Sequence, residues 1–237
     1  MKSCSKKVGV LSILLLVVFA VNVLSYHAVD NSLSADDKRY IPMYLHDVRP
    51  LSNNPTYQDE LKFIVSIQRS VLDIAPGNSG LPFGQKREVK ELYEAKSGLC
   101  YDRSRVIEKL LRFSGFETRH ISMYSKAETG SAIKSLMTPG VPSHAVTEVL
   151  TKNGWLVVDS NSVWVSTDAN DQPVSMNTIQ LKVENSVTIK WNRKPPSSIY
   201  MQSFTFMYGL YSRHGYFYPP YNRLPDINYA EFVQNVL

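Results

Sequence analysis

The spacing of apolar residues changes along the chain and predicts both helices and strands. Between residues 98 and 113 the apolar side chains recur at helical spacing, and Gly115 supplies a stop signal. Residues 57–72 show a second helical pattern, and residues 89–96 are expected to form a short helix leading into the first. The chain between residues 57 and 113 is therefore predicted to be mainly helical.

Strand-like runs follow in the second half. The run 145–150 alternates and is rich in β-branched residues, and 155–159 follows it across the turn Lys152-Asn153-Gly154. Asn-Gly is a strong hairpin signal, so these two strands are predicted to be adjacent and antiparallel. Further strands are predicted over residues 119–124 and 181–191.

One of the two cysteines lies where a helix begins. Cys100 falls in the first turn of the 98–113 helix. The free N–H groups and the positive dipole end of a helix favour a thiolate there, and one N–H can also point at a developing oxyanion. Free cysteines are also among the most buried residues, so on its own Cys100 fits a structural residue equally well.

His144 and Asp159 change that balance. His144 enters the first strand of the hairpin and Asp159 leaves the second, so both are expected at the same end of the pair. There the carboxylate can orient the imidazole, and the imidazole can activate a thiol. A loop over residues 125–142 leads to His144 and is expected to border the cleft.

Four short motifs resemble one known family. They are Gly98-Leu99-Cys100, the run 115–119, the run Ser143–Val149 and the run Trp155–Asp159. Their order and spacing are similar to those of the transglutaminase-like superfamily, over roughly residues 60 to 166. The resemblance implies an α+β fold with a papain-like core, in which the cysteine helix packs on an antiparallel sheet.

The resemblance also implies roles for the candidate residues. Cys100 would be the nucleophile, His144 the base and later the acid, and Asp159 the orienting carboxylate. No cofactor or metal is implied. Val146 departs from the pattern, because the family often has an aromatic residue after the histidine.

The family's second oxyanion donor lies upstream of the cysteine. Gln68, Gln85 and Tyr93 are candidates for it, because their side chains can donate a hydrogen bond. Each also fits an ordinary surface or packing residue, and the sequence leaves the choice open.

The N-terminus predicts a location outside the cytoplasm. Three lysines precede an uncharged run from Val8 to Leu24, as in a signal peptide or a membrane anchor over residues 1–25. Cys4 precedes the apolar run, so it is not placed as a lipoprotein-type acceptor. The positive residues predict an N-terminus in the cytoplasm and a domain on the periplasmic or extracellular face, either anchored by a single pass or secreted.

Composition excludes several other classes of function. The formal charge of +5 falls to +2 once residues 1–25, with three lysines and no acidic residue, are set aside. That charge does not indicate a nucleic-acid partner. The five histidines show no metal-site spacing, and no glycine-rich phosphate loop is present. Beyond the leader, Cys100 is the only cysteine, and a free thiol in an oxidising compartment favours a reactive role.

The remaining residues suggest three regions. Residues 26–56 are expected to be a spacer or arm, residues 57–177 the core, and residues 178–237 a strand-containing, Tyr/Phe/Pro-rich extension packed on it. The aromatic residues of the extension fit packing across the domain, or alternatively a wall for a carbohydrate or peptide. His214 fits a loop residue or a substrate contact.

These patterns support an extracytoplasmic cysteine hydrolase or acyltransferase. Its substrate would be a peptide, protein or envelope-associated amide, and the reaction would pass through a thioester acyl-enzyme. The alternative is a non-catalytic transglutaminase-like module for binding or assembly in the cell envelope, for example in polysaccharide export or biosynthesis. A third interpretation makes Cys100 a redox or scaffold thiol, against which the absence of a resolving cysteine argues.

Overall fold

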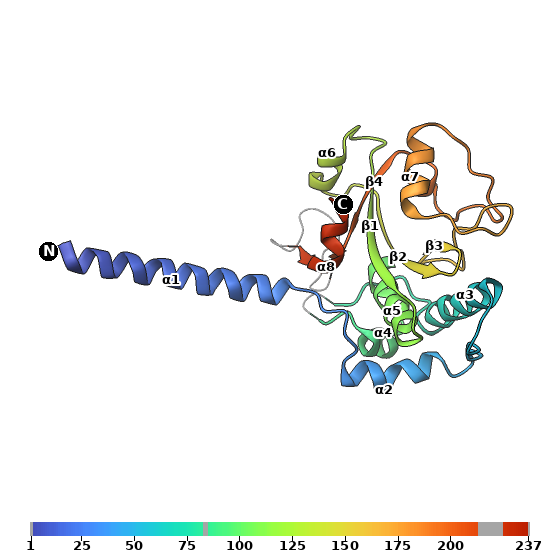
Figure 1. Ribbon diagram of the computed structural model, residues 1–237, viewed down its shortest axis with the longest axis horizontal. Coiled ribbons are helices and arrows are strands. Elements are labelled where there is room, and N and C mark those ends of the chain that lie inside the picture. The colour runs from blue at the N-terminus through green and yellow to red at the C-terminus, as the bar shows by residue number, and fades with distance from the viewer. Residues whose placement is uncertain (1, 83–84, 213–224, 237) are drawn as a thin grey trace.

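The computed structural model describes residues 2–82, 85–212 and 225–236, with side chains described from Ser12 onward (Figure 1). Its helices are α1 (Lys2–His27), α2 (Ala35–Tyr44), α3 (Tyr57–Ile74), α4 (Val89–Ala95), α5 (Cys100–Phe113), α6 (Ala132–Met137), α7 (Met176–Glu184) and α8 (Tyr229–Phe232). Its strands are β1 (Thr118–Ser125), β2 (Ser143–Thr151), β3 (Gly154–Val158), β4 (Phe204–Tyr208), β5 (Leu210–Tyr211) and β6 (Asp226–Ile227). The fold is therefore a mixed α+β fold, as predicted.

The main sheet is antiparallel, with strand order β3-β2-β1-β4. Strands β2 and β3 form the predicted hairpin, in which Thr151 pairs with Gly154. Gly154 has φ of 124°, a conformation that a residue with a side chain rarely adopts, so this glycine suits the tight turn. Strand β4 comes from the C-terminal extension, which thus completes the sheet.

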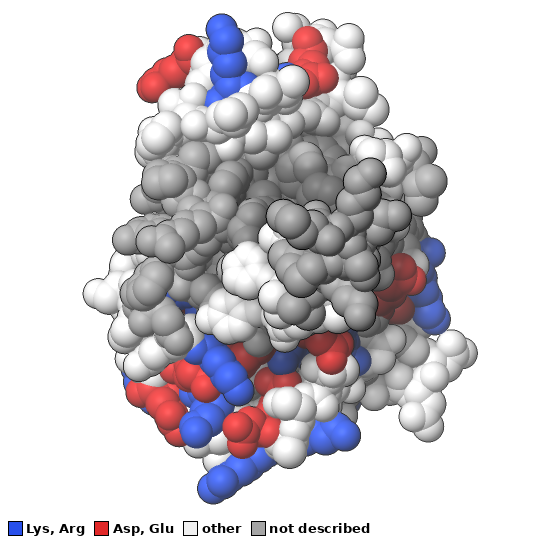
Figure 2. Space-filling model, turned by 90° about the vertical axis from the view of Figure 1, so that its left-hand side faces the viewer, with Lys and Arg blue, Asp and Glu red and all other residues white. Residues whose placement is uncertain are grey.

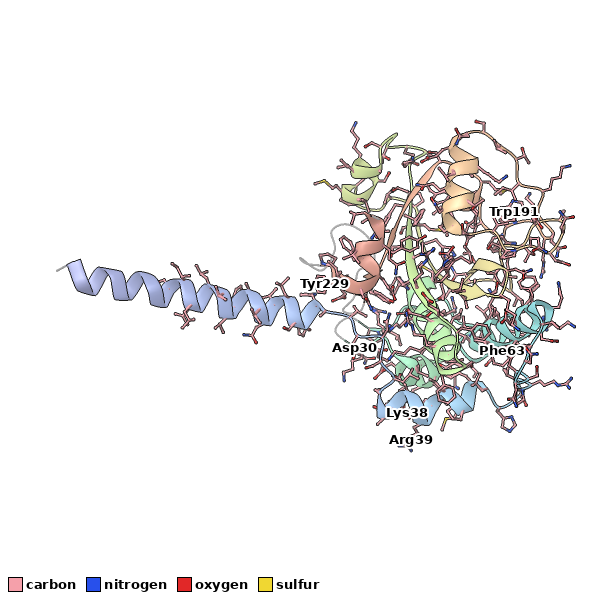
Figure 3. All side chains as sticks on the ribbon, viewed as in Figure 1. Asp30, Lys38, Arg39, Phe63, Trp191 and Tyr229 are labelled. Atoms are coloured by element: carbon pink, nitrogen blue, oxygen red, sulfur yellow. The ribbon has the colours of Figure 1, made fainter. Side chains whose placement is uncertain are left out.

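Helix α5 lies against β1 and β2, with α3 and α4 packed on its other sides (Figure 1). The apolar face of α3 follows helical spacing through Phe63, Ile64, Ile67 and Val71, all of which are buried. Phe63, labelled in Figure 3, stacks on Phe116 with ring centroids 6.0 Å apart. These contacts form the larger apolar core.

Every residue of α5 from Asp102 to Leu111 is buried, including its charged side chains. Buried charges are costly unless they are paired, so each one takes a partner from another segment. Arg105 binds Glu88, Lys109 binds both Asp37 and Glu88, and Asp102 binds Arg87. The central helix is thereby tied by ion pairs to α2 and to the segment before α4.

The opposite face of the sheet carries a second core. Strands β1 and β2 contribute Ile121, Met123 and Val146, and helix α7 contributes Met176 and Ile179. Trp164 packs there, against Tyr200 at 4.9 Å and against Trp191, which is labelled in Figure 3, at 5.6 Å between ring centroids. The sheet is thus covered on both sides.

Two predictions about local structure were wrong. The expected strand over residues 181–191 is occupied by the end of α7 and an irregular segment. Ser175 caps α7 by accepting from Thr178 N at 3.2 Å, and Met176 and Ile179 are buried one turn apart, so helical packing outweighs the β-rich composition. The expected loop over residues 125–142 contains α6.

The stretch 26–56 also differs from the expected spacer, because it contains α2. Ser34 and Asp37 form a capping box at the start of this helix. Ile41 and Tyr44 are buried in the larger core. This stretch is therefore packed on the domain.

The described part of the C-terminal extension packs aromatic rings on the domain. Phe204, Tyr208 and Tyr211 are buried. Glu231 of α8 accepts from the main-chain N of His120 at 2.9 Å and pairs with Arg112 at 3.0 Å, which fastens the end of the chain to β1 and α5. His214 and the aromatic residues Tyr216, Phe217, Tyr218 and Tyr221 lie outside the described residues.

Helix α1 extends away from the domain (Figure 1). Its described apolar side chains are exposed, and they include Ile13, Leu14, Leu16 and Phe19. Within the described residues, no helix combines the length and apolar character that a bilayer crossing needs. On the face of the domain that Figure 2 presents, Lys and Arg side chains lie next to Asp and Glu side chains in its lower half.

The core assignment can be tested by truncating one buried residue of α5. Ile107→Ala should lower the free energy of unfolding by about 2–5 kcal/mol, because Ile107 is fully buried and its removal leaves a cavity. Ile133→Ala is the matched control, because Ile133 is 71% exposed, and its effect should stay within about 0.5 kcal/mol. Equal effects of the two substitutions in denaturant titrations would contradict the described core.

Candidate active site

The thiol of Cys100 lies at the N-terminal end of α5, as predicted. Cys100 is the first residue of the helix and is a free, partly exposed thiol. The turn before it is held by Asp102, whose Oδ2 accepts from the main-chain N of Leu99 at 2.8 Å. A Cβ on Gly98 would lie 2.5 Å from Leu92, so the close approach there requires glycine.

His144 and Asp159 lie at the same end of the β2–β3 hairpin. His144 is the second residue of β2, and Asp159 directly follows β3. His144 Nε2 lies 2.8 Å from Asp159 Oδ2. Since that nitrogen is occupied by the carboxylate, Nδ1 is the ring atom left for the thiol, and Cys100 is one of the groups that raise the pKa of His144.

The carboxylate sets the charge of the imidazole. Burial by itself favours neutral His144, but the adjacent charge of Asp159, its hydrogen bond and the influence of Cys100 outweigh burial and raise the pKa of His144 to about 10. Burial also opposes ionisation of Asp159, but the charge and hydrogen bond of His144 outweigh burial and hold the pKa of that carboxyl below its usual value. An imidazolium–carboxylate pair therefore faces the thiol.

Asp159 itself is fixed by three further donors. The hydroxyl of Tyr200 donates to Oδ2 at 2.7 Å, and the main-chain N–H groups of Asn161 and Ser162 each donate to Oδ1 at 2.8 Å. Burial and the charge of Asp159 raise the pKa of Tyr200 well above its usual value, which keeps this hydroxyl a donor. The carboxylate thus presents a defined orientation to His144.

Gln68 of α3 holds the loop that follows β3, which contains Asp159. Its Nε2 donates to the main-chain oxygens of Asp159 at 2.6 Å, Ser162 at 3.0 Å and Trp164 at 2.7 Å. Neither Gln68 nor Tyr200 carries a sequence signal for this role, because both come from segments distant from the three motifs. The contacts with Asp159 appear only once the chain is folded.

Two of the three candidates for the second oxyanion donor are engaged in other contacts. Gln68 is buried, and its Nε2 is already shared among three acceptors. Tyr93 packs edge-on against Tyr40 and Tyr44, with ring centroids 5.7 and 5.5 Å apart. Gln85 is exposed on the segment before α4.

A cleft of about 370 Å³ opens beside His144 and Asp159. Its lining is dominated by uncharged polar side chains, which are Ser125, Ser143, Asn161, Ser162, Ser197, Ser198 and Gln202, with Pro142, Pro196 and Ile199. Apart from the His144–Asp159 pair, no charged side chain is part of the described lining. Within the described part of the chain, no group of three or more His, Cys, Asp or Glu side chains is arranged to hold a metal ion.

Comparisons with known proteins agree with the family resemblance. Residues 53–160, which include the cysteine, histidine and aspartate motifs, match the model of the transglutaminase-like superfamily. Comparison with curated protein sequences gives no match.

One solved structure is similar in part. It is the crystal structure of a protein from Cytophaga hutchinsonii, provisionally named a cysteine protease, with 11% sequence identity and a TM-score of 0.39. The match covers 74% of this chain and 48% of that one, so the chain spans about half the length of its neighbour. The segment from residue 53 to residue 160 is thus similar to the core of the transglutaminase-like superfamily.

Proposed function

We propose that this protein is a transglutaminase-like cysteine hydrolase or acyltransferase that acts on an amide or peptide bond through Cys100, His144 and Asp159. The observation that carries the proposal is the hydrogen bond between His144 and Asp159 at the edge of a polar cleft, with Cys100 among the groups that raise the pKa of His144. Thiol, imidazole and carboxylate in this arrangement are the components of nucleophilic catalysis at a carbonyl group.

In the first half-reaction, His144 holds the proton of the thiol and the thiolate attacks the carbonyl carbon. The new C–S bond gives a tetrahedral oxyanion, which a main-chain N–H at the start of α5 can stabilise. When the C–N bond breaks, His144 donates its proton to the leaving amine and a thioester remains on Cys100.

In the second half-reaction, an acceptor attacks the thioester. His144 takes a proton from water or from an amine, the C–S bond breaks, and the product is a carboxylic acid or a new amide. Asp159 stabilises the imidazolium in both halves and keeps its orientation. The three residues serve hydrolysis and transamidation equally.

The lining of the cleft supports a neutral, hydrogen-bonding substrate. Its serine, asparagine and glutamine side chains offer donors and acceptors, and no lysine, arginine or glutamate is among the described lining residues to select a charged group. A peptide or carboxamide segment with small polar groups fits this chemistry. The proposed substrate is therefore a peptide, protein or envelope-associated amide.

We also propose that residues 1–25 act as a membrane anchor or signal peptide, which would place the domain on the periplasmic or extracellular side. The support is the uncharged run from Val8 to Leu24 behind three lysines, and the exposure of its apolar side chains from Ile13 onward. Helix α1 covers none of the domain in Figure 1, so these side chains have no described apolar partner on it.

The acyl-transfer chemistry can be tested with p-nitrophenyl acetate, which needs no knowledge of the natural substrate. Wild-type protein should release one equivalent of p-nitrophenolate in a burst and carry one acetyl group on Cys100 in mass spectrometry. His144→Ala should slow acylation by about 10²- to 10⁴-fold, because the thiol loses its base.

Cys100→Ser and His46→Ala serve as controls. The first should abolish acetylation at position 100, and the second should react like wild type because the His46 side chain is 82% exposed and pairs with the exposed Asp47. If wild type and His144→Ala react equally slowly with this ester and with iodoacetamide, the catalytic proposal fails and a binding module becomes the better interpretation.

The pH dependence of stability tests the His144–Asp159 pair. The raised pKa of His144 means that its contribution is fully present below pH 6.5 and is lost as the pH rises through about 10. The lowered pKa of Asp159 means that its contribution is present above about pH 4 and is lost on acidification. In denaturant titrations, the advantage of wild type over Asp159→Asn should therefore be largest near pH 5–6 and shrink toward pH 10.

Tyr200→Phe is the matched control for this profile. It removes one hydrogen bond to Asp159 Oδ2 but keeps the carboxylate, so its stability relative to wild type should vary less between pH 6 and pH 10 than that of Asp159→Asn. If the stability difference between wild type and Asp159→Asn stays constant from pH 6 to pH 10, the His144–Asp159 pair is not ionised as described.

The anchor proposal is tested by fractionation of cells that express the full chain or a form without residues 1–25. The full chain should remain with membranes after alkaline carbonate and be released by detergent, whereas the shortened form should be soluble. A cleaved leader would instead give a soluble protein whose N-terminus, by mass, lies near residue 25. A soluble full-length chain with an intact N-terminus would contradict both forms of the proposal.

A further inference from the structure

The N-terminal helix joins the domain directly. The apolar run of α1 ends at Leu24, and only three residues later His27 Nδ1 lies 2.9 Å from Asp226 Oδ1 beside β6. The main-chain N of Val29 then donates to the main-chain oxygen of Ile227 at 2.9 Å. The chain is therefore fixed to β6 from the last residue of α1 onward.

This attachment sets how far the domain can stand from a bilayer. From Leu24 to His27 a helix advances about 5 Å, which is comparable to the depth of a headgroup layer. The run from Val8 to Leu24 rises about 25 Å, which is less than the hydrocarbon thickness of about 30 Å. If α1 is the proposed anchor, it has no spare length, and the side of the domain from which it emerges lies at the membrane surface.

That side of the domain carries α6, α8 and the end of the chain (Figure 1). Both α6 and α8 contact the edge strand β4, and Tyr229 of α8 is labelled on this side in Figure 3. Figure 2 views the same side. Its charged side chains lie at the top edge, at the right margin and over the lower half, and the described residues between them are uncharged. An uncharged band thus surrounds the point where α1 leaves the domain.

Helix α6 turns its apolar side chains outward. Ser135 is fully buried, and its Oγ donates to the main-chain oxygen of Ser125 at 2.8 Å. Ile133 and Met137, four residues apart and therefore on one face of the helix, are 71% and 72% exposed. This arrangement is the reverse of that expected for a short helix between a protein core and water.

The C-terminal end shows the same reversal. Glu231 of α8 is buried, whereas Tyr229 and Val233, again four residues apart, are 47% and 51% exposed. Val236 is 84% exposed. Single exposed apolar residues are common, but two inverted helices on one uncharged side of a domain indicate that this side meets an apolar medium.

We propose that α6, α8 and residues 233–236 form a docking surface for the lipid bilayer. Its side chains would enter the boundary between headgroups and acyl chains, and they are Ile133, Met137, Tyr229, Val233 and Val236. This inference rests on the proposed anchor and adds the lipid surface as a partner of the domain itself. Tyrosine suits that boundary because its ring is apolar and its hydroxyl polar.

Docking would also position the cleft. Ser125, whose main-chain oxygen holds Ser135 of α6, is one of the residues that line the cleft beside His144. The cleft therefore begins next to the docking surface, and a docked domain would present it close to the bilayer. This position suits an envelope-associated amide as substrate.

The test uses environment-sensitive labels on the full chain in phosphatidylcholine nanodiscs, which leave both sides of the bilayer open to solvent. The chain has two cysteines, so Cys4→Ser/Cys100→Ser removes both, and Met137→Cys or Val233→Cys then supplies one site for the fluorophore NBD. Leu181→Cys is the matched control, because Leu181 is 51% exposed, like Val233, but lies on α7, away from α1 in Figure 1.

Brominated phosphatidylcholine should quench the labels at positions 137 and 233 by about 3-fold or more relative to the label at position 181, because side chains at the boundary lie about 5–10 Å deep. Aqueous iodide should quench the labels in the reverse order. Ile133→Glu/Val236→Glu should raise iodide access at position 233 to the level of position 181, since carboxylates at this depth oppose docking. Leu181→Glu should leave the label at position 233 unchanged.

Two failures can be told apart. If the full chain inserts but the labels at positions 137 and 233 respond like the label at position 181, the docking inference is overturned and the anchor proposal stands. Labels shielded from both quenchers would show a protein contact, such as a second copy of the chain, and would also overturn it. If the intact full chain does not insert, the anchor proposal and the docking inference are both overturned.

Discussion

The burial of α5 from Asp102 to Leu111 is the constraint on which the rest of the structure depends. A helix enclosed on all sides is usually apolar, yet this one carries charged residues between Asp102 and Lys109. Each buried charge must find a partner, and the partners come from different parts of the chain. The same ion pairs and hydrogen bonds that satisfy the helix therefore hold α2 and the segment before α4 in place, and they fix the direction in which the helix presents Cys100.

The site is assembled where this helix meets the β2–β3 hairpin. The hairpin brings His144 and Asp159 to one end of the sheet, and the carboxylate is then fixed from two further directions, by Tyr200 from the C-terminal extension and by Gln68 from α3. Because β4 of the extension is also a strand of the main sheet, the residues after the family core are part of the architecture of the site. A core limited to the family segment would lack one of the donors to Asp159.

Electrostatics and the cleft point to the same kind of chemistry. Asp159 raises the pKa of His144 despite burial and so favours the charged imidazole. The cleft beside this pair is polar but offers no further charge among its described residues. Under the proposed function, such a site would concentrate its charge on the reacting atoms and leave recognition of the substrate to hydrogen bonds with serine, asparagine and glutamine side chains.

The sequence by itself determined the cysteine helix and the β2–β3 hairpin, because these depend on local patterns. Helical spacing placed Cys100 at a helix start, and Asn-Gly between two β-rich runs placed His144 and Asp159 at one end of a hairpin. It failed over residues 181–191, where a cap at Ser175 and burial of Met176 favour a helix over strand-like composition. Only the tertiary structure decided the roles of Gln68 and Tyr200, because each bonds to residues far away in sequence and such pairings leave no periodic trace in the chain.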